Sequence, residues 1–372
     1  MKKTDYYGRI ENLYSDMEKQ KMDLLIIAGD VWRPGNIFYT TGWAPGAGGV
    51  SQAWALLILK KNKGPELVVG FEFVPSAREI VDKKIKVLPS TEIKQIICAL
   101  SSDRNKHGKV GIIGLNILNA NLYTLICKYI DVSTIFDATN ILNTYRRIKT
   151  KEELEKIKRS HELTDKAIIA AMQSIREGIS EREIASAGMA KIHEMGGLLG
   201  FYPTVGTGEH SAFPMQMCTD KKVRENSNIL VDFGVNYEGF FSDCTRTAGY
   251  HLEDNYKIKM ITTCIEAKNE VMKIIRPGLI NCEIERLIRG YISDAGFGSY
   301  IVHDSGHGIG LDQEEEYIVN INSDTILEPN MTFTLEPGIY VPGIGGCRIE
   351  EMVYVTDNGC QKFSNLKDEW FL

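Results

Sequence analysis

Over residues 1–146, short apolar runs alternate with stretches whose apolar residues follow helical spacing. The runs predict buried strands, because a strand covered on both faces is apolar along its whole length. The stretches around them predict helices that begin near Tyr7, Glu92 and Leu118. Such alternation favours an α/β domain. The predicted strands are residues 23–28, 55–59, 66–69 and 110–113.

A long amphipathic pattern begins at Thr150 and continues to Ile175. Thr150 followed by Glu153 is a capping-box pattern, which is typical of a helix start. Glu177-Gly178 is typical of a helix end. The pattern is longer than most helices of globular proteins, so we expect a kink or a break within it.

The same change of pattern marks a domain boundary near residue 147. It divides the chain into a first domain, 1–146, and a second domain, 147–372. The second domain is expected to add two helices and then glycine-rich strands, with no internal repeat. These helices are 181–194 and 254–275, and the strands are 228–233, 245–248, 331–335 and 347–355.

Composition narrows the class of protein. The chain has 372 residues, 43% hydrophobic and 25% charged, as in an average soluble protein. Its 43 Lys and Arg against 49 Asp and Glu give a net charge of -6, which argues against a nucleic-acid partner. No apolar run has the length of a membrane span and no signal-peptide core is present, so we expect a cytoplasmic protein without a membrane partner. The eight cysteines include no CxxC pair, which predicts free thiols.

Two aspartates in the second domain are candidate metal ligands. Asp232 ends the apolar run 228–231, and Asp243 follows a turn signal at Glu238-Gly239. A hairpin over this segment would place the two carboxylates side by side. Buried carboxylates repel each other unless a cation or a proton lies between them. Oxygen ligands of this kind suit a pair of divalent metal ions.

Three more residues complete a possible ligand set. His307 stands between glycines, and Glu336 and Glu350 stand at the ends of apolar strands or inside them. Taken singly, each candidate has an ordinary explanation as a turn, surface or loop residue. Two Asp, one His and two Glu together are a plausible ligand set for a two-metal hydrolytic centre.

These motifs resemble the pita-bread metallohydrolases, which include methionine aminopeptidase, aminopeptidase P, prolidase and creatinase. The resemblance covers residues 147–372, and the spacing of Asp232 and Asp243 is the one this family uses. The spacing of Glu336 and Glu350 is more like prolidase. The first domain is similar to the smaller N-terminal domain of prolidases and creatinase. The resemblance therefore implies an α/β N-terminal domain and an α+β pita-bread catalytic domain.

The resemblance also implies a role for each candidate ligand. Asp232 would chelate one metal, His307 and Glu336 would hold the other, and Asp243 and Glu350 would bridge the two. The ligand set suits Mn²⁺ best, with Co²⁺, Zn²⁺ or Fe²⁺ as alternatives.

Four residues would then have catalytic roles. Glu336 would move the proton to the leaving nitrogen. Arg348 and Tyr340 would face the site, and His303 would either touch the substrate or be an ordinary loop or core histidine.

The chain departs from the family at two positions. Peptidases of this family carry two further histidines, and Met215 and Glu314 stand in their places. Losing one oxyanion donor costs roughly 10²–10³ in turnover, so a retained ligand set with both imidazoles missing suggests a changed substrate. Glu314 would favour a cationic substrate. His210 lies five residues from the first position and could substitute only with a shifted loop.

Three functions follow from this resemblance. The first is hydrolysis of a C–N bond by an Xaa-Pro dipeptidase or aminopeptidase. The second is hydrolysis of a small non-peptide substrate, in the manner of creatinase or ectoine hydrolase, and the third is a non-catalytic binding protein. Two-domain relatives are commonly homodimers in which the partner's N-terminal domain lines the site. The stretch 43–49 would be such a lining or an exposed loop.

Overall fold

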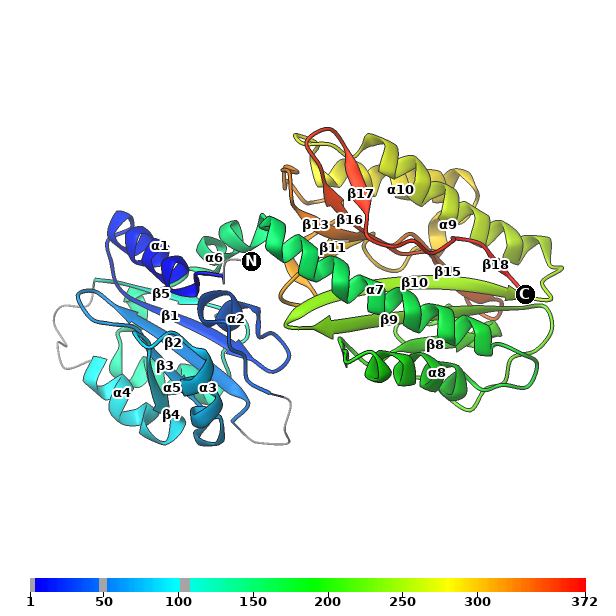
Figure 1. Ribbon diagram of the computed structural model, residues 1–372. Helices are drawn as coiled ribbons and strands as arrows, with labels where there is room; N and C mark the ends of the chain where they lie inside the picture. Colours follow the sequence, from blue (N-terminus) through cyan, green and yellow to red (C-terminus); the bar gives the residue numbers. More distant parts are fainter. Residues whose placement is uncertain (1–3, 47–51, 101–107) are drawn as a thin grey trace. The chain divides into compact units, whose positions relative to one another are not determined.

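The computed structural model describes residues 4–46, 52–100 and 108–372, and its chain divides into two compact units, Met1–Arg146 and Arg147–Leu372. Figure 1 shows the N-terminal unit in blue to cyan and the C-terminal unit in green to red. Among the described residues, no helix is both long enough and apolar enough to cross a membrane.

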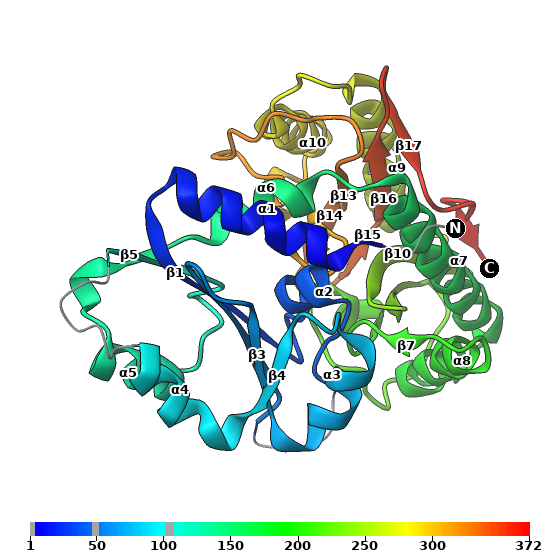
Figure 2. The same ribbon diagram turned by 60° about the vertical axis from the view of Figure 1, so that its left-hand side comes forward.

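The N-terminal unit alternates strands with helices (Figure 2). Its elements are α1 (Tyr6–Lys19), β1 (Met22–Asp30), α2 (Gly35–Thr41), β2 (Trp54–Lys60), β3 (Glu66–Val69), α3 (Val74–Ile80), β4 (Lys86–Pro89), α4 (Ile93–Leu100), β5 (Lys109–Ile113), α5 (Ala120–Tyr129), β6 (Ile135–Asp137) and α6 (Thr139–Arg147). They form a six-stranded sheet in the order β4-β3-β2-β1-β5-β6. β1 lies near its centre, antiparallel to β2 and parallel to β5.

The apolar runs of this unit form strands because helices cover them. Ile97 of α4 and Ile126 of α5 pack in one cluster with Ile26 of β1. α1 buries Ile10 and Leu13 and also contacts β1. The four predicted strands are confirmed as β1, β2, β3 and β5. β4 and β6 were not predicted, because β4 has only two consecutive aliphatic residues before Pro89 and β6 has only three residues.

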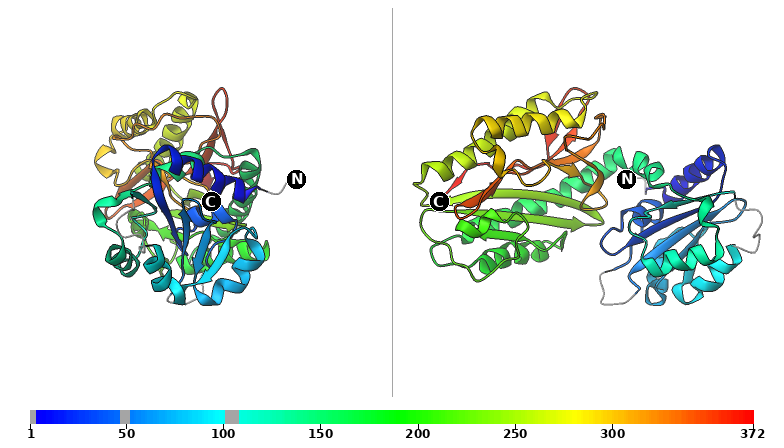
Figure 3. Two further views of the ribbon diagram at one scale, coloured as in Figure 1. Left: turned by 90° about the vertical axis from the view of Figure 1, so that its left-hand side faces the viewer. Right: turned by 180° about the vertical axis from the view of Figure 1, so that it is seen from behind.

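The C-terminal unit contains two helix pairs and the strands between them, shown in green and yellow in Figures 1 and 3. Its helices are α7 (Lys151–Ser174), α8 (Glu181–Glu194), α9 (Asn255–Ile274) and α10 (Asn281–Asp294). Its strands are β7 (Leu198–Leu199), β8 (Thr204–Thr207), β9 (Ser227–Tyr237), β10 (Phe240–Tyr250), β11 (His307–Gly308), β12 (Glu315–Ile318), β13 (Thr332–Leu335), β14 (Gly338–Val341), β15 (Gly345–Arg348), β16 (Glu351–Val355), β17 (Cys360–Lys362) and β18 (Trp370–Phe371).

The expectation of a kink or break in the long helix is wrong. α7 is one unbroken helix, and the predicted capping box at Thr150 and Glu153 is present. No glycine or proline interrupts the helix, and α7 packs along α8, β9 and β10. It ends at Ser174, four residues before Gly178.

The sequence shows no internal repeat in the strict sense, but the structure shows two similar halves. Each half of the C-terminal unit has a long helix, a turn and a second helix. In the first turn the Gly178 amide donates to the Val223 carbonyl at 3.0 Å, and in the second the Gly278 amide donates to that of Leu327 at 2.9 Å. Both glycines have left-handed φ values, 78° and 87°. Scattered identical residues mark this repeat in the sequence, among them Arg176 and Arg276, Gly178 and Gly278, and Glu183 and Glu283.

Each half has its own apolar core, and the candidate ligands are divided between the halves. Phe233 of β9 packs with Ile184 of α8, and Phe333 of β13 packs with Ile288 of α10. The first half contains the sheet of β7, β8, β9, β10 and β18, and the second contains the sheet of β11, β12, β13, β16 and β17. Candidate ligands from both sheets face one cavity.

Candidate metal centre and active site

The two aspartates lie on one β-hairpin, as predicted from the turn signal between them. β9 and β10 pair in antiparallel register, with Asp232 opposite Thr245 and Asp243 opposite Gly234. This register places both aspartates on the same face of the hairpin as diagonal neighbours. The turn consists of Glu238 and Gly239 with φ values of 51° and 86°, the left-handed geometry of a tight two-residue hairpin.

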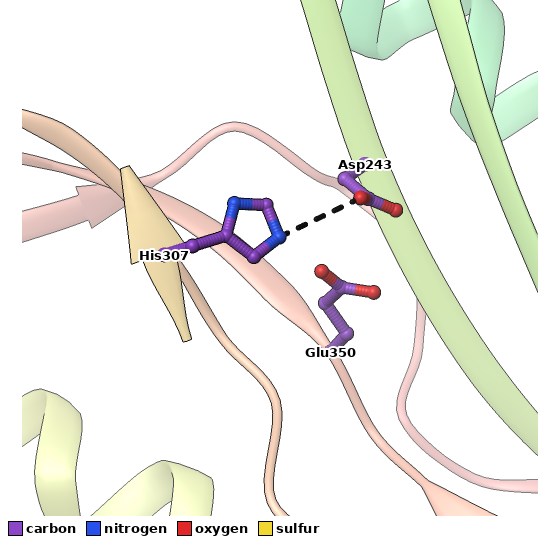
Figure 4. A group of neighbouring side chains, drawn as sticks. All are labelled: Asp243, His307 and Glu350. Atoms are coloured by element: carbon purple, nitrogen blue, oxygen red, sulfur yellow. Dashed lines mark ion pairs between the residues drawn. The ribbon is translucent and has the colours of Figure 1, made fainter. Parts of the chain in front are cut away.

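The other three candidates come from the second half of the unit. His307 lies on β11, Glu336 follows β13, and Glu350 lies between β15 and β16. Asp243, His307 and Glu350 point toward one another in Figure 4, and one potential ligand atom from each lies within 4.8 Å of the others. His307 Nε2 is 3.9 Å from Asp243 Oδ2 and 3.7 Å from Glu336 Oε1.

The orientation of the His307 ring fixes which nitrogen faces the carboxylates. Nδ1 lies 3.0 Å from the carbonyl oxygen of Gly308, which can only accept a hydrogen bond, so Nδ1 carries the hydrogen. Nε2 then presents its lone pair to Asp243 and Glu336. A lone pair facing two carboxylates is repulsive unless a proton or a metal ion lies between them.

Three carboxylates of the cluster each have one buried oxygen without a hydrogen-bond partner in the described part of the chain. These atoms are Asp232 Oδ1, Asp243 Oδ1 and Glu350 Oε1. Leaving buried polar atoms unsatisfied is costly, and such atoms usually bind a water molecule or an ion. Hard oxygen donors with one imidazole suit a divalent cation, so these residues fit a metal ion.

The raised pKa values of the cluster also indicate that a cation is needed among these carboxylates. Burial, together with repulsion from Glu350, Asp232 and Glu336, raises the pKa of Asp243 well above its usual value. Burial and neighbouring carboxylates raise the pKa of Glu350 to about 8, and burial raises the pKa of Glu336 to about 7. Bound cations remove this repulsion and keep the acids ionised.

Arg348 links the cluster to a second group of residues. Its Nη2 donates to Asp232 Oδ2, its Nε donates to Thr245 Oγ1 at 2.9 Å, and its Nη1 donates to the Tyr340 hydroxyl at 3.0 Å. The Tyr340 hydroxyl lies 2.8 Å from His303 Nε2. Since Arg348 only donates, the tyrosine oxygen accepts from it and its O–H donates to His303.

His303 is neutral in this arrangement. Its Nδ1 lies 2.7 Å from the Asp304 carbonyl oxygen and donates to it, which leaves Nε2 as the acceptor from Tyr340. Burial, with Arg348 nearby, lowers the pKa of His303 to about 4. Both ring nitrogens are therefore already occupied by protein partners.

Two residues of the site were not predicted from the sequence. Thr245 Oγ1 donates to Glu350 Oε2 at 2.8 Å while it accepts from Arg348, and Arg246 Nη1 donates to the Glu350 backbone carbonyl. Thr245 lies two residues after Asp243, on the same face of the hairpin. This alternation was the signal available in the sequence.

A cavity of about 520 Å³ adjoins the centre. All five candidate ligands line it, together with His303, Arg348 and the two positions of departure, Met215 and Glu314. The remaining lining residues are Phe201, Tyr202, Thr204, Pro214, Gln216, Met217, Asp304, Gly306, Gln313 and Ile318.

Other candidates lie away from this cavity. His210 is not among the residues that line it, and its Nδ1 lies 2.8 Å from the fully buried Glu181. Trp43, in the stretch expected to be a lining or an exposed loop, is buried against Phe73 in the N-terminal unit. Residues 47–49 of that stretch lie outside the described residues.

Comparison with known proteins decides the family. The family model described as metallopeptidase family M24 matches residues 155–357, and that of the creatinase/prolidase N-terminal domain matches residues 9–148. The chain belongs to metallopeptidase family M24. This M24 protein is 28% identical to an Xaa-Pro dipeptidase of Pyrococcus furiosus over 97% of this chain and 99% of that protein. It is 30% identical to an uncharacterised peptidase of Staphylococcus aureus over 94% of this chain and 97% of that protein.

Similar solved structures support the same family assignment. A prolidase from Pyrococcus horikoshii superposes with a TM-score of 0.87 at 26% identity, covering 97% of this chain and 99% of that chain. An Xaa-Pro dipeptidase from Bacillus anthracis superposes with a TM-score of 0.86 at 27% identity, covering 99% and 100%. These likenesses confirm the predicted two-part fold, an α/β N-terminal domain and a pita-bread catalytic domain. Membership of M24 confirms that the protein is a metallohydrolase.

Proposed function

We propose that this M24 protein hydrolyses the peptide bond before proline, using two divalent cations held by Asp232, Asp243, His307, Glu336 and Glu350. The observation that carries the proposal is the convergence of these five side chains on one cavity, with three buried carboxylate oxygens left unpaired. The names of the relatives, Xaa-Pro dipeptidase and prolidase, support the bond that is cleaved.

Two bound cations would polarise the scissile carbonyl and lower the pKa of the attacking water. The residues of this chain divide the remaining tasks. Asp232, Asp243, His307, Glu336 and Glu350 would hold the cations. The Glu336 carboxylate would take the proton from the attacking water and return it to the leaving proline nitrogen, so water is consumed and acid and amine are released.

The residues behind the ligands hold them in place. Arg348 fixes Asp232, and Thr245 fixes Glu350, so the two carboxylates cannot rotate away from each other. The Arg348–Tyr340–His303 chain of hydrogen bonds ends at a backbone carbonyl and leaves Tyr340 rigid beside the cavity. Tyr340 is not among the residues that line the cavity, so this chain of hydrogen bonds positions Arg348 and His303 and supplies no free donor.

The native metal, the oligomeric state and the cellular compartment are further parts of the proposal. We propose Mn²⁺ as the native metal, because oxygen ligands with a single imidazole suit it, with Co²⁺, Zn²⁺ or Fe²⁺ as substitutes. We propose a homodimer working in the cytoplasm, where the free thiols of the described cysteines stay reduced.

Met215 and Glu314 in the cavity wall favour a second candidate, hydrolysis of a C–N bond in a small non-peptide substrate. An assay separates the two. Protein stripped with a chelator and reloaded with Mn²⁺ is offered Ala-Pro, Ala-Pro-amide, Ala-Ala, creatine and ectoine. The proposal predicts cleavage of the proline peptides alone. If creatine or ectoine is cleaved and the proline peptides are not, the second candidate is the correct one.

A variant links the activity to this site. Glu336→Gln should lower kcat by about 10²–10⁴ because it removes the proton carrier. Glu328→Gln is the matched control, since Glu328 is exposed in the same unit and does not line the cavity. Equal activity of wild type and Glu336→Gln would refute the assignment of the site.

A further inference from the structure

Two acidic residues remain in the cavity after the five candidate ligands are accounted for. Asp304 and Glu314 both line it, and both are exposed to solvent. The guanidinium nearest to Asp304 is that of Arg289, whose Nη2 is 4.0 Å away and whose Nε already donates to Glu285. Two cations would offset the four carboxylate ligands, so the open part of the cavity keeps a negative charge.

The basic side chains that line the cavity already have partners within the protein. Arg348 donates to Asp232, Thr245, Tyr340 and the Pro214 carbonyl. Both nitrogens of His303 are bonded, and Nε2 of His307 faces the carboxylates of the centre. Among the described lining residues, no cationic side chain is left to receive a substrate carboxylate.

The cavity lining also contains large exposed apolar side chains. Met215 is 80% exposed, Met217 63% and Tyr202 49%, and all three line the cavity. A thioether donates no hydrogen bond, so the two methionines offer nothing to a carboxylate, and the Tyr202 hydroxyl offers one neutral donor. Thioether and aromatic faces do suit an alkyl chain, and an aromatic face also attracts a cation.

We propose that Glu314 is a specificity-determining residue, which selects substrates carrying a cationic group on an alkyl stem beyond the scissile bond and disfavours those ending there in a free carboxylate. The stem lies against Met215 and Met217, and the cation lies near Glu314 and Asp304. The inference rests on the proposed function, because it needs the cavity to be the substrate site. It predicts that a plain Xaa-Pro dipeptide is a poor substrate.

The test uses three substrates with one scissile bond: Ala-Pro, Ala-Pro-amide and the 2-aminoethylamide of Ala-Pro. They place a negative, a neutral and a positive group at the same end of the molecule. An exposed charge pair contributes up to about 1 kcal/mol, so we expect kcat/KM to rise by up to about fivefold at each step. The preference should shrink at high salt, because exposed charges are screened.

Variants assign the preference to one residue. Glu314→Gln should flatten the series and Glu314→Lys should reverse it, whereas Glu328→Gln should leave it unchanged. The same order is expected for binding of the products proline, prolinamide and proline 2-aminoethylamide to the Mn²⁺-loaded protein by calorimetry, which requires no turnover.

The outcomes separate the two claims. Cleavage of all three substrates with Ala-Pro preferred, or a preference unaltered in Glu314→Gln, would overturn the role of Glu314 and leave the proposed function standing. Cleavage of none would overturn the proposed function. In that case the calorimetric order decides the role of Glu314, and proline binding as tightly as its aminoethylamide would refute it.

Discussion

Glu350→Gln should change stability in opposite directions with and without metal. In the metal-free protein, burial and neighbouring carboxylates raise the pKa of Glu350 from 4.5 to about 8. The folded state therefore binds more protons than the unfolded state between these two pH values, and stability falls as pH rises through this window. At pH 7 the Glu350 carboxyl therefore lowers the free energy of unfolding by about 3 kcal/mol relative to an uncharged side chain of the same shape.

Glutamine removes this cost while keeping the shape. Its amide oxygen can still accept the hydrogen bond that Thr245 donates to Glu350 Oε2 at 2.8 Å. We therefore expect metal-free Glu350→Gln to be more stable than the wild type by about 1–3 kcal/mol at pH 7 and to show a weaker fall of stability with pH. With Mn²⁺ the order should reverse, because a ligand present at 100 times its Kd adds about 2.7 kcal/mol only where it binds.

The assay is a urea titration followed by circular dichroism, run with chelator and with Mn²⁺ from pH 5 to pH 8. Glu328→Gln, an exposed residue outside the cavity, is the control and should match the wild type in both conditions. The reasoning is refuted if Glu350→Gln is the less stable protein without metal, or if Mn²⁺ stabilises it as much as the wild type.

Other predictions concern residues around the centre. Arg246→Met should lower the free energy of unfolding by about 1–3 kcal/mol, because the wholly buried Glu351 loses its nearest partner at 3.1 Å and keeps only Lys362 and Lys268, at 3.7 and 3.8 Å. The exposed residue Arg182, 2.7 Å from its carboxylate partner, gives the control, and Arg182→Met should cost under about 1 kcal/mol in the same denaturant titration. Burial lowers the pKa of His161 to about 4, so the unfolded state takes up a proton as pH falls from 6.5 toward 4 and the wild type loses stability. His161→Phe removes this proton uptake, so its free energy of unfolding should rise by about 2 kcal/mol relative to the wild type between pH 7.5 and pH 5. Arg348→Met should weaken Mn²⁺ binding measured by calorimetry, and Arg348→Lys should restore it only in part, because an ammonium cannot replace the guanidinium fork; unchanged binding would contradict its positioning role.

Local patterns in the sequence predicted much of the site. The hairpin follows from a turn signal between two apolar runs, and its two-residue periodicity sets the faces of Asp232 and Asp243. His307, Glu336 and Glu350 were singled out by the glycine-rich or apolar segments around them, and the structure brings them to the same cavity.

What the sequence hid depends on contacts between distant segments. Thr245 bonds to Glu350 across 105 positions, so its spacing from Asp243 indicates its face of the hairpin but not its partner. The unbroken course of α7 is set by packing against α8 and the hairpin, which no capping signal records. The repeat that relates Gly178 to Gly278 survives in backbone geometry and in few residues.

The central claim is that two metal ions held by these five residues cleave the bond before proline. The most direct test titrates Mn²⁺ into chelator-treated protein while measuring hydrolysis of the Ala-Pro series and the metal content per chain. We expect no hydrolysis without metal, a rise that levels off at two Mn²⁺ per chain, and no such rise in the Asp243→Asn variant. Hydrolysis that persists in chelator, or a fully metal-loaded protein that cleaves no proline peptide, would contradict it.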